Sequence, residues 1–147
     1  MPLRSTEEIV VFYKKLPTYN PQFTEGKPLH GMGTKYKEGN RKNNNYGNFN
    51  STNQASAERA GDTKKYPKSL VTFQRAHSSV MLHPTEKPVA LMELLISTYT
   101  NKGETILDNC MGVGGSGIAA KNLERNYIGI ELDQKYFEVA KERIEVS

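Results

Sequence analysis

The chain has 147 residues, of which 36% are hydrophobic, and it contains one cysteine and no tryptophan. A single cysteine excludes a disulfide framework and a zinc site built from several cysteines, and no metal site is expected. The sequence contains no run of about 18 apolar residues, so we expect no membrane contact and a cytoplasmic location. Residues 1–80 carry 13 Lys and Arg against 6 Asp and Glu, whereas residues 81–147 carry 7 against 10.

Residues 1–80 show little regular periodicity. Residues 8–15 are β-branched and aromatic on both faces, which predicts a short strand inside a sheet, and residues 69–73 predict another. Seven of the fourteen positions from Asn40 to Asn53 are asparagine, which is typical of a long loop or of a segment that orders on binding. The basic side chains nearby suit either a solvated surface or contact with nucleic-acid phosphates: Lys35, Lys37, Arg41, Lys42, Lys64, Lys65 and Lys68.

Residues 81–147 are more regular, and they predict alternating helices and strands. The expected elements are a rigid turn at 83–88, a helix from Pro88 to about Tyr99, a strand at 105–108, a helix from about 118 to 125, a strand at 127–131 and a last helix capped by Asp133. A strand, a crossover helix and a second strand form a parallel βαβ unit, so the predicted fold class is α/β.

A glycine-rich loop joins the first of these strands to its helix. Gly112-x-Gly114-x-x-Gly117 matches a dinucleotide-binding fingerprint, and Glu131 ends the next strand where a ribose-binding acid belongs. Asp108, at the end of the preceding strand, would repel a pyrophosphate, whereas it would attract the sulfonium and ammonium of S-adenosylmethionine. The residues therefore favour S-adenosylmethionine, with a nicotinamide dinucleotide or a loop that only packs as alternatives.

Three motifs in this order resemble the C-terminal part of the DNA amino-methyltransferases, the adenine-N6 and cytosine-N4 enzymes whose cofactor motif follows the catalytic motif. They are His83-Pro84-Thr85-Glu86-Lys87-Pro88, Leu107-Asp108-Asn109-Cys110-Met111-Gly112 and Ile128-Gly129-Ile130-Glu131-Leu132-Asp133. The resemblance implies part of a Rossmann-like S-adenosylmethionine-dependent methyltransferase sheet with a polar, loop-rich insertion. Residues 1–80 would then hold a terminal strand and a target-recognition region, and residues 81–147 the cofactor-binding βαβ region.

The resemblance also implies roles for individual residues. Those that would bind S-adenosylmethionine are Thr85, Lys87, Asp108, Asn109, Gly112, Gly114, Ser116 and Glu131. Asp108, Gly112 and Gly114 would shape the methionine-binding loop, Glu131 would hold the ribose, and the turn at 85–88 would close over the methionine end. Val113 and Gly115 stand where the family usually has hydroxyl residues, which predicts weaker cofactor binding than in a typical member.

One family motif is missing from the sequence. These enzymes hold a flipped base with an Asp/Asn/Ser-Pro-Pro-aromatic motif, and none of the seven prolines here is next to another. No catalytic residue is therefore assigned, and we expect an N-terminally shortened member that begins after that motif. The implied partner is double-stranded DNA, and an incomplete sheet predicts a second copy or a complementary N-terminal fragment as a further partner. The alternative function is a non-catalytic DNA- or cofactor-binding remnant.

Overall fold

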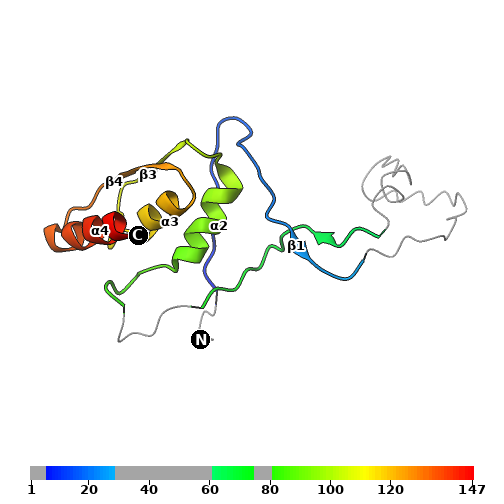
Figure 1. The fold of residues 1–147 in the computed structure, drawn as a ribbon, viewed down its shortest axis with the longest axis horizontal. Coiled ribbons are helices and arrows are strands. Elements are labelled where there is room, and N and C mark those ends of the chain that lie inside the picture. The colour runs from blue at the N-terminus through cyan, green and yellow to red at the C-terminus, as the bar shows by residue number, and fades with distance from the viewer. Residues whose placement is uncertain (1–5, 29–60, 75–80) are drawn as a thin grey trace, which may run out of the picture. The chain divides into compact units, whose positions relative to one another are not determined.

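A computed structural model of the chain describes residues 6–28, 61–74 and 81–147 (Figure 1). The chain forms two compact units, one of residues 1–22 and 70–147 and the other of residues 23–69. The predicted asparagine-rich loop at 40–53 lies outside the described residues. The division of roles between residues 1–80 and 81–147 stays a prediction.

The larger unit is built around a parallel βαβ arrangement, which confirms the predicted α/β fold class. Strands β3 (Thr105–Asp108) and β4 (Asn126–Gly129) pair in parallel, with Thr105 opposite Asn126 and Asp108 opposite Gly129. Helix α3 (Gly115–Asn122) joins the two strands and packs against α2 (Val89–Tyr99), against β4 and against α4 (Gln134–Val146) (Figure 1).

The core lies between α2, α3 and one face of the small sheet. Ile96 of α2 meets Ala119 and Ala120 of α3, and both alanines are fully buried because their small side chains let the two helices approach closely. The residues packed around this centre are Val89, Met92, Ile106, Leu123 and Tyr127.

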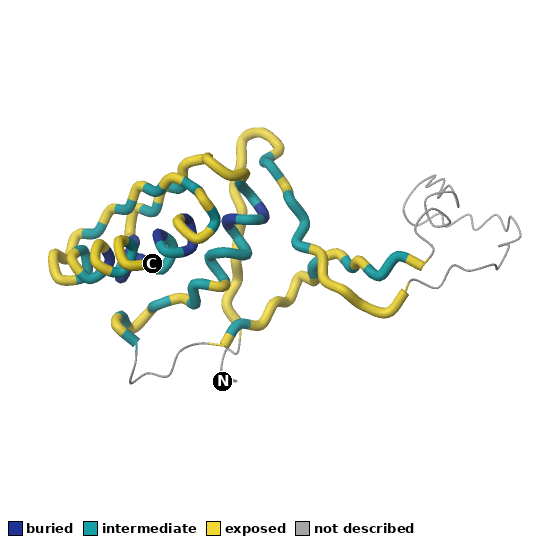
Figure 2. The backbone as a smooth tube through the Cα atoms, in the orientation of Figure 1, coloured by how far each residue is buried: buried dark blue, intermediate teal, exposed yellow. Residues whose placement is uncertain are grey.

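The two strands alternate between the core and the opposite face of the sheet (Figure 2). Ile106 and Tyr127 are register partners that face the core. Their neighbours Leu107 and Ile128 are also paired and remain 64% and 54% exposed. Successive strand residues point to opposite faces, so the face that carries Leu107 and Ile128 is largely uncovered.

The strands predicted at 8–15 and 69–73 are wrong, because the described residues of both segments form no strand. Phe12 is 90% exposed instead of lying inside a sheet. Extended residues become a strand only where a neighbouring backbone accepts and donates the ladder hydrogen bonds. Residues 17–22 are instead anchored to the end of α2, where the Asn20 side chain donates to the carbonyl oxygens of Ser97 and Thr100.

Helix boundaries differ modestly from those predicted. Pro88 is the N-cap of α2 rather than its first residue, and Asp133 caps α4 as predicted, accepting from the backbone N–H groups of Lys135 and Tyr136. Helix α3 begins at Gly115, three residues earlier than predicted, because the chain winds into a helix directly after Gly114 in its left-handed conformation. No helix in the described parts of the chain is long and apolar enough to cross a membrane.

The smaller unit contains a short antiparallel ribbon. Strands β1 (Thr24–Glu25) and β2 (Lys64–Lys65) pair with Thr24 opposite Lys65. Beside them, the rings of Phe23 and Tyr66 pack with their centroids 4.8 Å apart.

Candidate functional site

The candidate site lies where the carboxyl ends of β3 and β4 meet. Asp108 is the last residue of β3, and Glu131 follows β4 by two residues. The backbone N–H of Ile130 donates to the Asp108 carbonyl at 2.8 Å, and the N–H of Met111 donates to the Ile130 carbonyl at 3.0 Å. This edge of a parallel sheet is where α/β proteins bind ligands, and the glycine-rich loop begins at this point.

The loop owes its path to two glycines in the left-handed region. Gly112 has φ of 54° and Gly114 has φ of 78°, a region that side-chain-bearing residues rarely adopt. A Cβ added to Gly114 would lie only 2.9 Å from the Cβ of Ala140, so α4 packs directly on the loop backbone. The loop therefore requires glycine at 114 both for its conformation and for this close approach.

Glu131 holds the loop through its carboxylate. Oε2 accepts from the Gly112 N–H at 2.8 Å, and Oε1 accepts from the N–H groups of Leu132 and Asp133, each at 3.0 Å. Hydrogen bonds from the Asp133 and Gly112 amides stabilise the ionised form and lower the pKa of Glu131 below its ordinary value. The residue predicted to bind ribose is therefore ionised and also organises the glycine loop.

Glu131→Gln is expected to reduce the loss of stability that acid causes. A lowered folded-state pKa stabilises the fold above the unfolded-state pKa, and this stabilisation disappears as the pH falls through the folded-state value. Urea unfolding between about pH 6 and pH 3 should show a smaller decrease for Glu131→Gln than for the wild type. Glu138→Gln, an exposed change on α4, is the control. If the free energy of unfolding falls equally steeply with pH in Glu131→Gln and in the wild type, the lowered pKa is wrongly assigned to Glu131.

Asp108 is tied to the first turn of α3 and to β4. Oδ1 accepts from the Cys110 N–H at 3.1 Å, and Oδ2 accepts from the Ser116 hydroxyl. The Ser116 oxygen also lies 2.8 Å from the Tyr127 hydroxyl, and burial of that ring raises the pKa of Tyr127. The Ser116 hydroxyl thus joins the carboxylate of Asp108 to the partly buried phenol of Tyr127.

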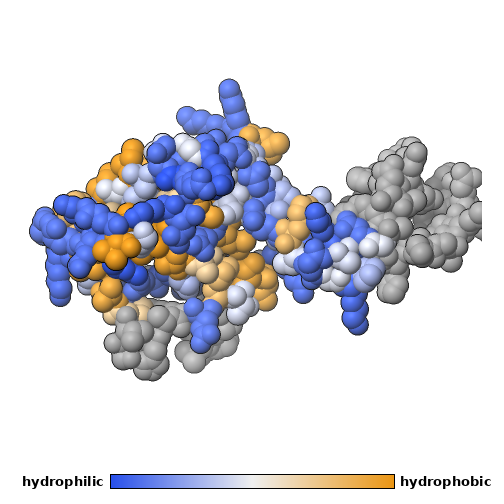
Figure 3. Space-filling model, in the orientation of Figure 1, coloured by the Kyte–Doolittle hydropathy of each residue, from blue (hydrophilic) through white to orange (hydrophobic). Residues whose placement is uncertain are grey.

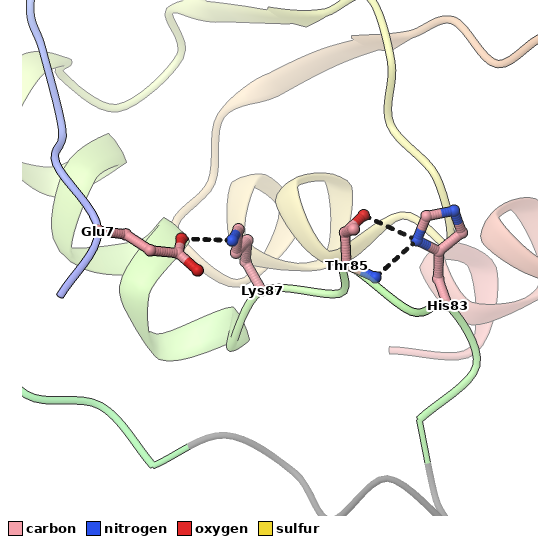
Figure 4. Close-up of polar contacts among 4 residues, drawn as sticks. All are labelled: Glu7, His83, Thr85 and Lys87. Carbon is pink, nitrogen blue, oxygen red and sulfur yellow. Dashed lines mark hydrogen bonds and ion pairs between the residues drawn. The ribbon is translucent and has the colours of Figure 1, made fainter. Parts of the chain in front are cut away.

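The turn at 83–88 lies beside the loop, because a Cβ added to Gly115 would be 3.6 Å from the Lys87 carbonyl oxygen. Figure 4 shows Lys87 turned toward the carboxylate of Glu7, with which it forms an ion pair, and Thr85 turned toward His83. The backbone N–H of Thr85 donates to His83 Nδ1 at 3.2 Å, and its hydroxyl lies 3.0 Å from the same atom. Both predicted site residues of this turn are therefore held by other side chains.

The structure places six of the eight predicted cofactor residues around the ends of β3 and β4: Asp108, Asn109, Gly112, Gly114, Ser116 and Glu131. Asn109 is exposed, and its side-chain oxygen lies 3.7 Å from the Cys110 sulfur. Sequence reasoning placed Glu86 only within the turn at 85–88 and assigned no role to Arg143, and the two side chains form an ion pair at 2.9 Å. Their side chains meet across the fold, so neither motif spacing nor periodicity signals the contact.

The basic residues predicted to bind DNA do not adjoin this cluster along the chain. Lys64 and Lys65 form β2, and Lys68 follows them as an exposed residue of the smaller unit. Lys35, Lys37, Arg41 and Lys42 lie outside the described residues. Within the described ranges, no three His, Cys, Asp or Glu side chains are grouped so that they could hold a metal ion.

A family model described as DNA methylase, N6_N4_Mtase, matches residues 2–142. The chain belongs to this family. The match begins far upstream of the three motifs, which lie between His83 and Asp133, and it confirms the predicted membership of the DNA amino-methyltransferases.

Similar proteins align with only part of the chain. It is 43% identical over 63 residues to the type II methyltransferase M2.DpnII of Streptococcus pneumoniae, covering 43% of this chain and 24% of that protein. It is 46% identical over 61 residues to the type II methyltransferase M2.MboI of Moraxella bovis, covering 42% and 22%. A crystal structure of an M1.HpyAVI–SAM complex is 52% identical over 44% of this chain and 32% of that one, with a TM-score of 0.43. The chain spans about a quarter of the length of the curated relatives it matches.

Proposed function

We propose that this chain is the S-adenosylmethionine-binding part of a DNA amino-methyltransferase. The observation that carries the proposal is the pair of carboxylates, Asp108 and Glu131, at adjacent strand ends around a loop of left-handed glycines. A methyl group would pass from the sulfonium of the cofactor to an exocyclic amino nitrogen of adenine or cytosine. Membership of the DNA methylase family supports this reaction class.

The chemistry of the donor set suits this cofactor. Asp108 would lie beside the cationic sulfonium and ammonium groups, because its carboxylate ends β3 at the mouth of the loop. Gly112 and Gly114 would let the loop backbone approach the methionine part of the cofactor closely. The turn that carries Thr85 and Lys87 would approach the same part. Asn109, exposed at the strand end, would add a polar contact.

Glu131 would accept hydrogen bonds from the ribose hydroxyls. A carboxylate offers about four acceptor positions, and three backbone amides occupy Glu131 already. Two ribose hydroxyls would therefore displace at least one amide, and the Gly112 N–H, which belongs to the loop, is the one whose release would open the site.

Double-stranded DNA is the proposed substrate. The basic excess within residues 1–80 supports a role for this part of the chain in contacting phosphates. Lys64 and Lys68 are exposed in the smaller unit, and Lys65 lies between them on β2. The predicted location in the cytoplasm stays a prediction.

A covering chain is proposed for the open face of the sheet. Leu107, Ile128 and Ile130 are 64%, 54% and 53% exposed along β3 and the extension of β4, and apolar surface of the larger unit is visible among its hydrophilic side chains (Figure 3). Apolar faces of this kind are usually buried in an interface. This supports a second copy or a complementary N-terminal fragment as partner. Light scattering of the purified chain would distinguish the two, because a second copy would give the mass of a dimer and a missing fragment would leave the mass of a monomer.

The second candidate is a remnant that binds cofactor or DNA without turnover. The observation that favours it is that no two of the seven prolines are adjacent, so the family's base-holding motif does not occur in these residues. A tritiated-methyl transfer assay on unmethylated DNA separates the two candidates: label in the DNA supports the enzyme, and cofactor binding without label supports the remnant.

Isothermal titration calorimetry with S-adenosylmethionine and with NADH tests the cofactor itself. We expect saturable binding of S-adenosylmethionine and none of NADH, because a dinucleotide would bring its pyrophosphate next to Asp108. Binding of NADH alone would overturn the proposal in favour of a nicotinamide-binding protein.

A further inference from the structure

One guanidinium joins the two segments that border the candidate site. Arg143, on α4, donates from Nη1 to the carbonyl oxygen of Val113 in the glycine loop at 2.7 Å. Its Nη2 lies 2.9 Å from Oε1 of Glu86 in the turn at 83–88. The other carboxylate oxygen of Glu86 accepts from the Leu82 N–H at 3.2 Å, so the turn is held at its start as well.

This bridge is partly withdrawn from water. The side chains of Arg143 and Glu86 are 26% and 16% exposed, and Val113 is 3% exposed. Partial burial strengthens a charge-assisted contact relative to one on the open surface, where ion pairs contribute little. The Lys102–Glu124 pair, with side chains 69% and 70% exposed, is of the latter kind.

Helix α4 is also the platform on which the loop rests. Ala140 is fully buried against Gly114, and a Cβ on Gly117 would lie 2.3 Å from Cδ1 of Ile144. These contacts fix the loop against α4 by packing. The turn at 83–88 contacts α4 through the His83 ring, which packs edge-on against Tyr136 with ring centroids 4.5 Å apart. The Glu86–Arg143 pair adds a charged link from the same turn to α4 and, through Nη1 of Arg143, to the loop.

We propose that Arg143 is a positioning residue of the cofactor site. It holds the turn and the glycine loop at one separation, with one arm of its planar fork on each segment. The proposal rests on the proposed function, in which these segments enclose the methionine end of S-adenosylmethionine. Lysine cannot replace it, because an ammonium group lacks two diverging donors in fixed geometry.

The test compares two ligands in wild type, Arg143→Lys and Lys141→Ala. Lys141 is an exposed residue of α4 and serves as the control. S-adenosylmethionine carries the amino-acid part that the two segments would enclose, whereas 5′-methylthioadenosine lacks it. We expect Arg143→Lys to weaken S-adenosylmethionine binding about ten-fold and 5′-methylthioadenosine binding less than about two-fold, with no change for Lys141→Ala. Calorimetry measures all six affinities.

Glu86→Gln provides a second test, because it removes the charge from the other partner and keeps an acceptor for the Leu82 N–H. We expect Glu86→Gln to weaken the binding of S-adenosylmethionine more than that of 5′-methylthioadenosine. This test remains valid when Arg143→Lys does not fold. If the wild type binds S-adenosylmethionine, the inference is overturned when Glu86→Gln and a folded Arg143→Lys lose equal affinity for both ligands. It is also overturned when neither variant loses affinity. Failure of the wild type to bind S-adenosylmethionine would overturn the proposed function and this inference with it.

Discussion

Asp108→Asn is expected to weaken S-adenosylmethionine binding about 100-fold, because the cofactor's positive charges lose an ionised neighbour at the end of β3. Asp108 now accepts from the Cys110 N–H at Oδ1 and from the Ser116 hydroxyl at Oδ2. Asparagine keeps one oxygen for the Cys110 N–H, and its NH2 group can donate to the Ser116 oxygen in place of the second bond. The expected loss therefore comes from charge rather than from a rearranged loop. Calorimetric affinities of the two proteins provide the measurement.

Two comparisons make this prediction specific. S-adenosylhomocysteine lacks the sulfonium charge, so Asp108→Asn should weaken its binding less than that of S-adenosylmethionine. Asp133→Asn is the matched control, because it neutralises an exposed acid at the same end of the sheet, and asparagine is an equally good N-cap for α4. Equal losses in the two variants would show that Asp108 acts only through the net charge.

Gly114→Ala is expected to destabilise the fold by about 3 kcal/mol, from the left-handed backbone and from overpacking together. The added Cβ would meet the Cβ of Ala140 at 2.9 Å and its Cα at 3.1 Å. Neither atom can move without shifting α4. The free energy of unfolding, measured by urea denaturation followed by circular dichroism, gives the size of the effect.

Gly103→Ala separates the two causes. Gly103 has φ of 80°, close to the 78° of Gly114, but a Cβ added there has no atom within 4 Å. It should therefore cost only the backbone term, about 1 kcal/mol. If Gly114→Ala and Gly103→Ala cost the same, the close approach of α4 to the loop is not as described.

The sequence predicts the elements of residues 81–147 well where their signals are local. Helix α2, strand β3 and the Asp133 cap follow from periodicity and from capping chemistry over a few residues. The strand expected at 8–15 fails because β-branched residues require a partner strand, and pairing is not a local property. The sequence places the start of α3 too late because glycine usually indicates a loop. Here Gly117 stands inside the helix, where an added Cβ would lie 2.3 Å from Cδ1 of Ile144 and 2.8 Å from Cε1 of Tyr127.

The candidate site divides in the same way. Asp108 and Glu131 could be found from the sequence, because each ends a predicted strand of one βαβ unit. The hydrogen bond from Gly112 to Glu131 and the bridge from Arg143 to Val113 and Glu86 could not, because they join residues far apart in the chain. Such contacts arise only when the sheet and α4 are both in place.

The central claim, that the glycine loop and the two strand-end carboxylates bind S-adenosylmethionine, is tested most directly by amide resonances of the ¹⁵N-labelled chain. On titration with S-adenosylmethionine, we predict large shifts for Gly112, Gly114 and Glu131, with Gly103 and the β1–β2 ribbon unchanged. Resonances of the loop that stay in place at saturating cofactor, or shifts confined to other residues, would contradict the account.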